Sequence, residues 1–147
     1  MPRSPIFLDS NVFLYAAGRE HPLRDPCRRA LDRLASGSVL AVTSSEVLQE
    51  ILHVVSRTGA RGDAARLVRH VLDLVPDVLP VRREEVAHAC ELIEHDSRID
   101  PRDAVHVATM RLRGLTEILT ADRHFDAIEG IRRIDPSGFG DFGRSKV

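Results

Sequence analysis

The 147-residue sequence contains no Trp, one Tyr, five Phe, two Cys and a single Lys. With so few aromatic residues, we expect no aromatic platform on which nucleobases could stack. Cys27 and Cys90 are far apart and form no C-x-x-C pair, so neither a zinc site nor a disulfide framework is indicated; we expect two buried, reduced thiols.

Long apolar runs are also missing. No stretch approaches the ~20 apolar residues of a membrane span, and the run from Ile6 to Leu8 is too short for the core of a signal peptide. We therefore expect a cytoplasmic protein with no membrane contact.

The sequence has no excess of charge of one sign: 21 Lys and Arg stand against 22 Asp and Glu. This balance gives no general signature of nucleic-acid binding. It does not exclude a nucleic-acid enzyme, because carboxylates gathered at one metal site would leave the remaining surface net positive. All basic residues but Lys146 are Arg, a bias that indicates genomic base composition rather than function.

Short apolar segments alternate along the chain with amphipathic segments of helical period. We expect strands at 5–8, 39–43, 77–81, 117–120 and 131–134. We expect helices at 11–18, 25–36, 44–58, 63–75, 83–95 and 100–113. The alternation predicts an α/β fold, a three-layer sandwich with a mostly parallel sheet of four to five strands and helices on both faces. Pro80 places the third strand at an edge. The predicted domain spans 1–135, followed by a loosely ordered Gly-rich tail at 136–147.

Four acidic residues fall where the carboxyl ends of the strands should meet. Asp9 directly follows the first strand, Glu46 lies three residues past the second, and Asp122 lies two residues past the fourth. Asp103 occupies the first turn of a helix whose preceding loop can reach the same edge. Because functional crevices of open α/β sheets lie at this edge, we expect the four carboxylates to converge.

Such a cluster needs a cation. Two unit charges ~4 Å apart repel by ~1 kcal/mol in water and by ~4 kcal/mol near a protein surface. All-oxygen ligands favour hard ions, so we expect Mg²⁺, with Mn²⁺ as a substitute. Such an ion would activate a water and neutralise phosphate charge during hydrolysis of a phosphodiester.

Each acid also has a structural interpretation. Asp9 could be a turn residue, but the apolar residues on both sides of it favour function. Glu46 lies on a polar helix face, so only its position favours function. That face also holds Gln49, Glu50 and His53.

The acids from residue 100 onward can likewise be explained by either a structural or a functional role. Asp100 is best explained as the cap of a helix with Pro101 in its first turn, so we assign it a structural role. Asp103 begins a helix that is apolar over most of its circumference, and a buried helix that starts with a carboxylate implies a partner for it. Asp122 and Asp126 could each cap a short turn; we favour Asp122 and keep Asp126 as a further candidate metal ligand.

The histidines give a weaker signal. Asp103 and His106 are three residues apart on one helix, which is compatible with a shared ligand site. A single helical His is more often packed or solvated, so we do not assign His106 as a ligand. His53 and His124 carry no special pattern either.

Four segments in order resemble one family across essentially the whole chain. They are I-F-L-D-S-N-V-F-L, S-E-V-L-Q-E, D-P-R-D-A-V-H-V-A-T and I-L-T-A-D-R-H-F. In order and spacing they are similar to the PIN-domain ribonucleases, specifically the VapC-like toxins of toxin–antitoxin pairs. The resemblance implies a PIN-like sandwich and a metal-dependent endoribonuclease that leaves 5′-phosphate and 3′-hydroxyl ends.

The resemblance also implies roles for individual residues and partners. The acidic cluster would consist of Asp9, Glu46, Asp103 and Asp122, with Glu46 acting directly or through water. Asn11 and Thr120 would orient carboxylates or waters. The family further implies a homodimer and a small antitoxin, which would lay an apolar segment between the early helices and direct a basic side chain at the acids.

Three other functions stay open at this point. F-L-D-S-N-V also resembles the nucleophile motif of haloacid-dehalogenase-like phosphatases, with Asp9 as nucleophile, although Asn11 replaces the second acid and Lys146 lies in the tail. Paired histidines could cleave RNA without metal, but their spacing does not recommend it. A non-catalytic module could bind RNA or protein, yet such a polyanion binder gains nothing from clustered acids.

Overall fold

The computed structural model describes residues 3–141, and a five-stranded sheet forms its centre. The strands are β1 (Ile6–Leu8), β2 (Ala41–Ser44), β3 (Val78–Leu79), β4 (Glu117–Leu119) and β5 (Arg132–Ile134). Their order is β3-β2-β1-β4-β5, and every neighbouring pair is parallel. The predicted parallel sheet is thus confirmed, with β3 at an edge as Pro80 indicated.

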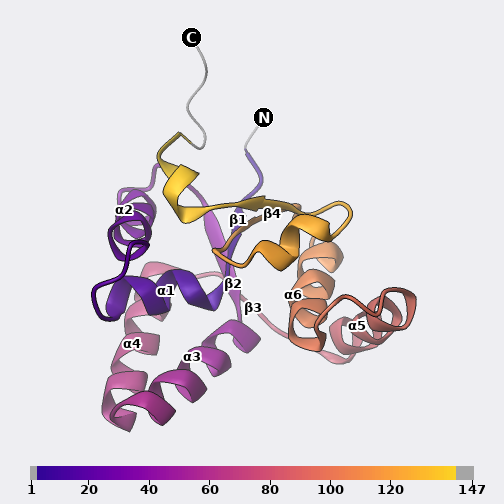
Figure 1. Ribbon diagram of the computed structural model, residues 1–147, viewed down its shortest axis with the longest axis horizontal. Coiled ribbons are helices and arrows are strands. Elements are labelled where there is room, and N and C mark those ends of the chain that lie inside the picture. Colours follow the sequence, from indigo (N-terminus) through magenta and orange to yellow (C-terminus); the bar gives the residue numbers. More distant parts are fainter. Residues whose placement is uncertain (1–2, 142–147) are drawn as a thin grey trace.

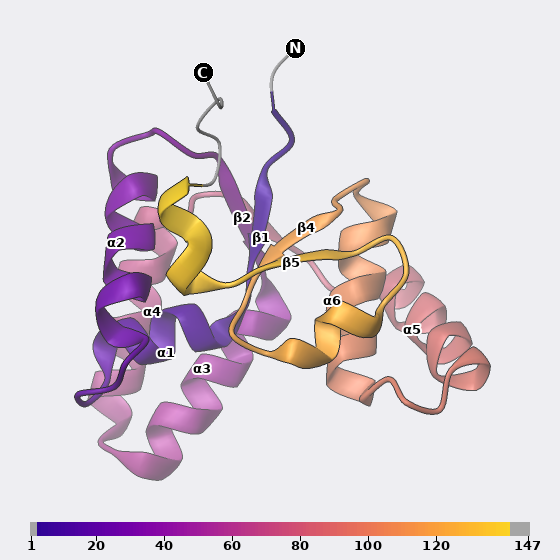
Figure 2. The same cartoon turned by 45° about the horizontal axis from the view of Figure 1, so that its top comes forward.

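Six α-helices cover the two faces of this sheet. They are α1 (Ser10–Ala17), α2 (Arg24–Ala35), α3 (Ser45–Thr58), α4 (Arg61–Leu74), α5 (Arg83–His95) and α6 (Pro101–Leu112). Helices α1 to α4 lie on one side, and α5 and α6 pack together on the other (Figures 1 and 2). The three-layer α/β sandwich expected from the alternating pattern is therefore confirmed.

The register of the central strands sets the position of the residues that follow them. Phe7 pairs with Ile118 and Leu8 with Leu119, and all four side chains are completely buried. Strands β1 and β4 therefore end at the same level. As a result, Asp9 and Thr120, the next residues of the two strands, lie beside each other at the carboxyl edge of the sheet.

Polar caps start the helices near this edge. The Ser44 hydroxyl accepts a hydrogen bond from the Val47 amide at the start of α3. Asp100 caps α6 with Pro101 in its first turn, as predicted. Gly114, two residues past the end of α6, has a φ of 67°, a left-handed conformation that favours glycine and turns the chain toward β4.

The C-terminal segment differs from the expectation of a loose tail. Pro136–Asp141 forms a 3₁₀ helix, η2, which packs against α2. The Phe139 side chain is only 1% exposed, and the Arg33 guanidinium lies 4.9 Å from the centre of its ring. The segment is ordered because it buries an aromatic side chain. The rest of the predicted tail, 142–147, lies outside the described residues.

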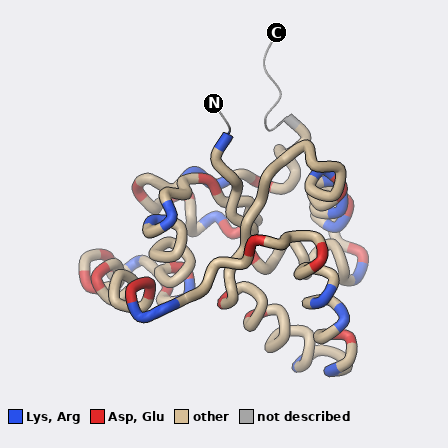
Figure 3. Tube along the Cα trace, turned by 180° about the vertical axis from the view of Figure 1, so that it is seen from behind, with Lys and Arg blue, Asp and Glu red and all other residues tan. Residues whose placement is uncertain are grey.

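Basic and acidic residues are interspersed along the helices (Figure 3). Cys27 is buried, but Cys90 is exposed on α5, so the expectation of two buried thiols is wrong for Cys90.

Within residues 3–141, no helix has the length and apolar character needed to cross a membrane.

Candidate functional site: an acidic cleft at the carboxyl edge of the sheet

A cleft of about 520 Å³ opens where β1 and β4 end. Its lining residues are Asp9, Ser10, Asn11, Leu14, Glu50, Asp100, Arg102, Asp103, His106, Asp122 and His124. The structure thus brings together Asp9, Asp103 and Asp122, three of the acids predicted to converge. Glu46 and Asp126 are not among the residues that line the cleft.

Asp9 is a buried carboxylate, only 6% exposed, that is held from several directions. Its Oδ1 accepts a hydrogen bond from the Ser10 amide at 2.8 Å, which makes Asp9 the cap of α1. Burial raises the pKa of Asp9. The charge of His106 and the hydrogen bond from Thr120 act in the opposite direction.

Thr120 and Asn11 join the ends of the two central strands through this carboxylate. The Thr120 hydroxyl donates to Asp9 Oδ2 at 2.8 Å and accepts from Asn11 Nδ2 at 2.8 Å and from the Asp122 amide at 3.1 Å. Asn11 Oδ1 accepts from the Ala121 amide at 3.1 Å. A satisfied network of this kind fixes the orientation of Asp9.

Asp103 and Asp122 form the outer part of the cleft. Burial raises the pKa of Asp103 to about 6, and the charges of Asp122, Asp100 and Asp9 add to the rise. Asp122 caps the 3₁₀ helix η1 (Arg123–Ala127) by accepting from the His124 amide at 2.9 Å. The mutual repulsion that raises the pKa of Asp103 is the repulsion that a bound cation would relieve.

Helix α3 contributes Glu50 to the cleft, one turn beyond Glu46. Glu50 and His106 lie on neighbouring elements, with Glu50 Oε2 at 3.6 Å from His106 Nε2. The interaction with His106 lowers the pKa of Glu50, which keeps the carboxylate ionised. In the sequence Glu50 appears only as one of several residues on a polar helix face, so its position could not be told from that of Glu46.

His106 is a second cleft residue that no sequence pattern distinguishes from an ordinary helical histidine. It is 2% exposed, and its Nε2 lies 3.8 Å from Asp9 Oδ1 in addition to the contact with Glu50. Burial disfavours its charged form, but the acids Glu50 and Asp9 outweigh burial, so the pKa of His106 is raised. The spacing of three residues from Asp103 was the available signal.

The remaining predicted acid, Asp126, lies elsewhere. Its Oδ1 accepts a hydrogen bond from Arg133 Nε at 2.9 Å. The guanidinium of Arg133 also donates to the Thr120 carbonyl and to Asp135. This ion pair joins η1 to β5, which is a structural role.

The donor set fits a divalent cation. The cleft contains two groups of candidate ligands, and within each group the ligand atoms lie within 4.8 Å of one another. One group is Asp9, Glu50 and His106; the other is Asp103, Asp122 and His124. Carboxylate oxygens dominate both groups, and such oxygens suit hard ions. Fold and cleft together define an α/β sandwich with a cluster of carboxylates at the carboxyl edge of its sheet.

Comparison with known proteins identifies the family. The PIN domain model matches residues 6–131, so the chain belongs to the PIN domain family, as the four segments indicated. Ribonuclease VapC23 of Mycobacterium tuberculosis is 39% identical over 120 residues, which cover 80% of this chain and 92% of the relative.

Solved structures share the fold. VapBC2 from Rickettsia felis, bound to a DNA fragment from its promoter, superposes with a TM-score of 0.71 at 18% identity; the match covers 90% of this chain and 98% of the other. A toxin–antitoxin complex from Klebsiella pneumoniae gives a TM-score of 0.65 at 17% identity, over 89% and 97% of the two chains. At these identities the likeness establishes the fold alone.

Proposed function

We propose that this protein is a metal-dependent endoribonuclease, the toxin of a toxin–antitoxin pair, which acts on RNA in the cytoplasm. The observation that carries the proposal is the convergence of Asp9, Asp103, Asp122 and Glu50 in one cleft. Membership of the PIN domain family and 39% identity to a VapC ribonuclease support the same function. The proposed cation is Mg²⁺, with Mn²⁺ as a substitute.

The acids of the cleft and the two residues that support Asp9 would have separate tasks. Asp9, Asp103 and Asp122 would hold the cation, with Glu50 in the place that we had assigned to Glu46. When bound, the cation supplies Lewis acidity that polarises the phosphodiester and promotes ionisation of a water. Asn11 and Thr120 keep Asp9 in one orientation, so the ligand oxygens are preorganised.

Glu50 is also suited to handle the proton of the attacking water. Its side chain is 23% exposed and lines the cleft, where an ionised carboxylate can accept a proton from a water. Attack in line on phosphorus with departure of the 3′-oxygen leaves 5′-phosphate and 3′-hydroxyl ends.

The test is incubation of the purified protein with total RNA in Mg²⁺, in Mn²⁺ or in EDTA, alongside D9N. We expect discrete cuts that require metal and Asp9, with 5′-phosphates at the mapped ends. Undiminished cleavage by D9N would refute the site. Cleavage that survives EDTA would favour the metal-free histidine mechanism, and RNA binding without cleavage would favour the non-catalytic module.

A matched pair of variants distinguishes the two candidate acids of α3. Glu50 lines the cleft and Glu46 does not, although both are partly exposed on the same helix. We expect E50Q to lower kcat about 100-fold or more, in the range of lost general-base or metal-ligand function. We expect E46Q to stay within about threefold of the wild type. The reverse order would restore the role predicted for Glu46.

A phosphatase that uses Asp9 as nucleophile is less compatible with the residues around it. Asn11 stands where the nucleophile motif would have its second acid, and its amide donates to Asp9 Oδ2 and to Thr120. No lysine is present among residues 3–141 to accompany such a nucleophile. Failure to trap a phosphorylated Asp9 with a phosphate ester is the expected result.

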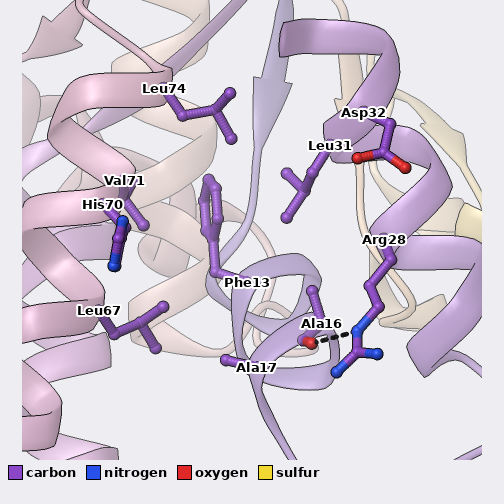
Figure 4. A pocket seen from close by; sticks show the side chains of 10 residues that line it. All are labelled: Phe13, Ala16, Ala17, Arg28, Leu31, Asp32, Leu67, His70, Val71 and Leu74. Carbon is purple, nitrogen blue, oxygen red and sulfur yellow. Dashed lines mark hydrogen bonds between the residues drawn. The ribbon is translucent and has the colours of Figure 1, made fainter.

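We propose further that the antitoxin binds an apolar groove between α1, α2 and α4. The groove has a volume of about 370 Å³, and Phe13 of α1 lies at its centre (Figure 4). Leu67, Val71 and Leu74 of α4 line one side, and Leu31 of α2 lines the other. An apolar helix face would fill a groove of this composition.

The apolar groove continues toward the acidic cleft. A second hollow of about 710 Å³ shares Ala17 and Leu67 with the groove and Leu14 with the cleft. A bound segment can therefore run from the groove to the acids, where a basic side chain would pair with the carboxylates. We expect L67E to abolish binding of the protein encoded beside this one while leaving RNA cleavage intact.

The homodimer remains a proposal as well. Val86 and Ile93 are seven residues apart on α5 and are 49% and 38% exposed on its outer side. A second copy of the chain would cover this apolar stripe. Light scattering should give twice the monomer mass for the wild type and the monomer mass for V86E. A monomeric wild type would rule out the dimer.

A further inference from the structure

His106 is a buried imidazole in the wall of the cleft, and the mechanism proposed above gives it no task. It lies one turn after Asp103 on α6 and is only 2% exposed. We propose that His106 is a positioning residue whose Nε2 keeps its proton, contacts both Asp9 and Glu50 as a donor, and does not bind the cation. The inference rests on the proposed metal site.

The two ring nitrogens have opposite surroundings. Nε2 lies 3.6 Å from Glu50 Oε2 and 3.8 Å from Asp9 Oδ1, at ion-pair distance from two carboxylates. Nδ1 is buried and has no hydrogen-bond partner among the described residues. On the core side, the ring lies 5.9 Å from the ring of Phe7.

These surroundings decide where the proton lies. With a proton on Nδ1 alone, an N–H group would be buried without an acceptor, and the Nε2 lone pair would point at two anionic oxygens. With a proton on Nε2, the donor faces both carboxylates, and only a lone pair is left in the apolar region. A protonated Nε2 has no lone pair for a metal, although Asp9, Glu50 and His106 lie close enough together to form a ligand group.

An N–H donor at Nε2 orients two carboxylates of the site. It lies between Asp9 at the end of β1 and Glu50 on α3, and it counteracts the repulsion between these two charges. Their remaining lone pairs are thereby turned toward the cleft. The inner ligand set is then composed of oxygen alone, which favours Mg²⁺ and Mn²⁺ over Zn²⁺.

The proton can be located directly by ¹⁵N NMR of the histidine side chains in the full-length protein. We expect the Nε2 of His106 to carry a proton in EDTA and to keep it when saturating Mg²⁺ is added. The exposed His53 of α3 serves as the internal reference. Loss of the Nε2 proton on addition of Mg²⁺, or a proton on Nδ1 alone, would overturn the inference.

Two near-isosteric variants test the positioning. His106→Gln places an amide donor near the position of Nε2, whereas His106→Met fills the same volume without a donor. Titration with Mn²⁺, followed by the EPR signal of the free ion, should give wild-type affinity for H106Q and about 10- to 100-fold weaker binding for H106M. Thermal unfolding in EDTA verifies that both variants are folded.

The outcomes separate this inference from the proposed function. Equal Mn²⁺ affinity for H106M and the wild type, or equal weakening in both variants, would overturn the positioning role alone. Absence of Mn²⁺ binding by the wild type would overturn the metal site, and this inference with it. If H106M does not fold, the NMR measurement on the wild type and the affinity of H106Q still decide the question.

Discussion

Replacing Asp103 by Asn should stabilise the metal-free protein while it removes a proposed metal ligand. Burial raises the pKa of Asp103 from its ordinary 3.8 to about 6, and the charges of Asp122 and Asp100 add to the rise. Between these pH values the folded protein binds more protons than the unfolded chain. The free energy of unfolding therefore falls as pH rises through this window, and the full penalty is present above pH ~6.

The size of the effect follows from the same pKa. The rise corresponds to ~3 kcal/mol, and we halve it to ~1.5 kcal/mol because the side chain is only half-buried and solvent screens its neighbours. For a domain of this size, such a gain raises Tm by about 4 °C. An asparagine of nearly the same shape removes the charge without leaving a cavity.

The assay is urea unfolding in EDTA, followed by circular dichroism because the chain has no Trp. We expect D103N to gain ~1.5 kcal/mol at about pH 7.5 and almost nothing at about pH 3.5, below both pKa values, where the carboxyl of Asp103 is protonated in the folded and in the unfolded chain. Asp25→Asn is the control, since Asp25 is an exposed first-turn aspartate of α2. Destabilisation of D103N at the higher pH, or an equal gain at both, would refute the reasoning.

Three further predictions use other parts of the structure. Thr120→Val should cost ~1–3 kcal/mol of stability and weaken Mn²⁺ binding about tenfold, because the Asp9 carboxylate loses its hydroxyl donor; unchanged Mn²⁺ affinity would contradict this. Among the described residues, Arg102 is the only arginine lining the cleft, so Arg102→Ala should raise KM for RNA about fivefold with little change in kcat, whereas Arg69→Ala on α4 should not. Phe139→Ala should cost ~3 kcal/mol in urea unfolding, and a cost near zero would restore the loose tail.

The positions that could be predicted from the sequence are those fixed by strand ends. Asp9 and Asp122 follow short apolar strands within three residues, and parallel strands bring such ends to one edge. Asp103 could be inferred because a carboxylate that begins a mostly apolar helix needs a partner. In these cases one local pattern determines the position.

The positions that could not be predicted depend on how helices are oriented. Glu46 and Glu50 lie one turn apart on the same polar face, and the choice between them depends on the direction in which α3 leaves β2. No local pattern encodes that direction. The position of His106 could not be predicted for a similar reason, because its burial beside Asp9 results from the packing of α6 near the end of β1. The order in the C-terminal segment depends on the long-range contact of Phe139 with Arg33.

Helix α1 begins at the Asp9 cap and contains only eight residues. At 1.5 Å of rise per residue, its whole length is about 12 Å. The acidic cleft thus lies at the N-terminal end of α1, and the apolar groove is lined by residues nearer the C-terminal end of the same short helix. About four residues of extended chain are enough to cover that distance. A very short stretch beyond a groove-binding helix could therefore reach the acids, and the length of that stretch, more than its sequence, would decide whether an occupant of the groove also silences the enzyme.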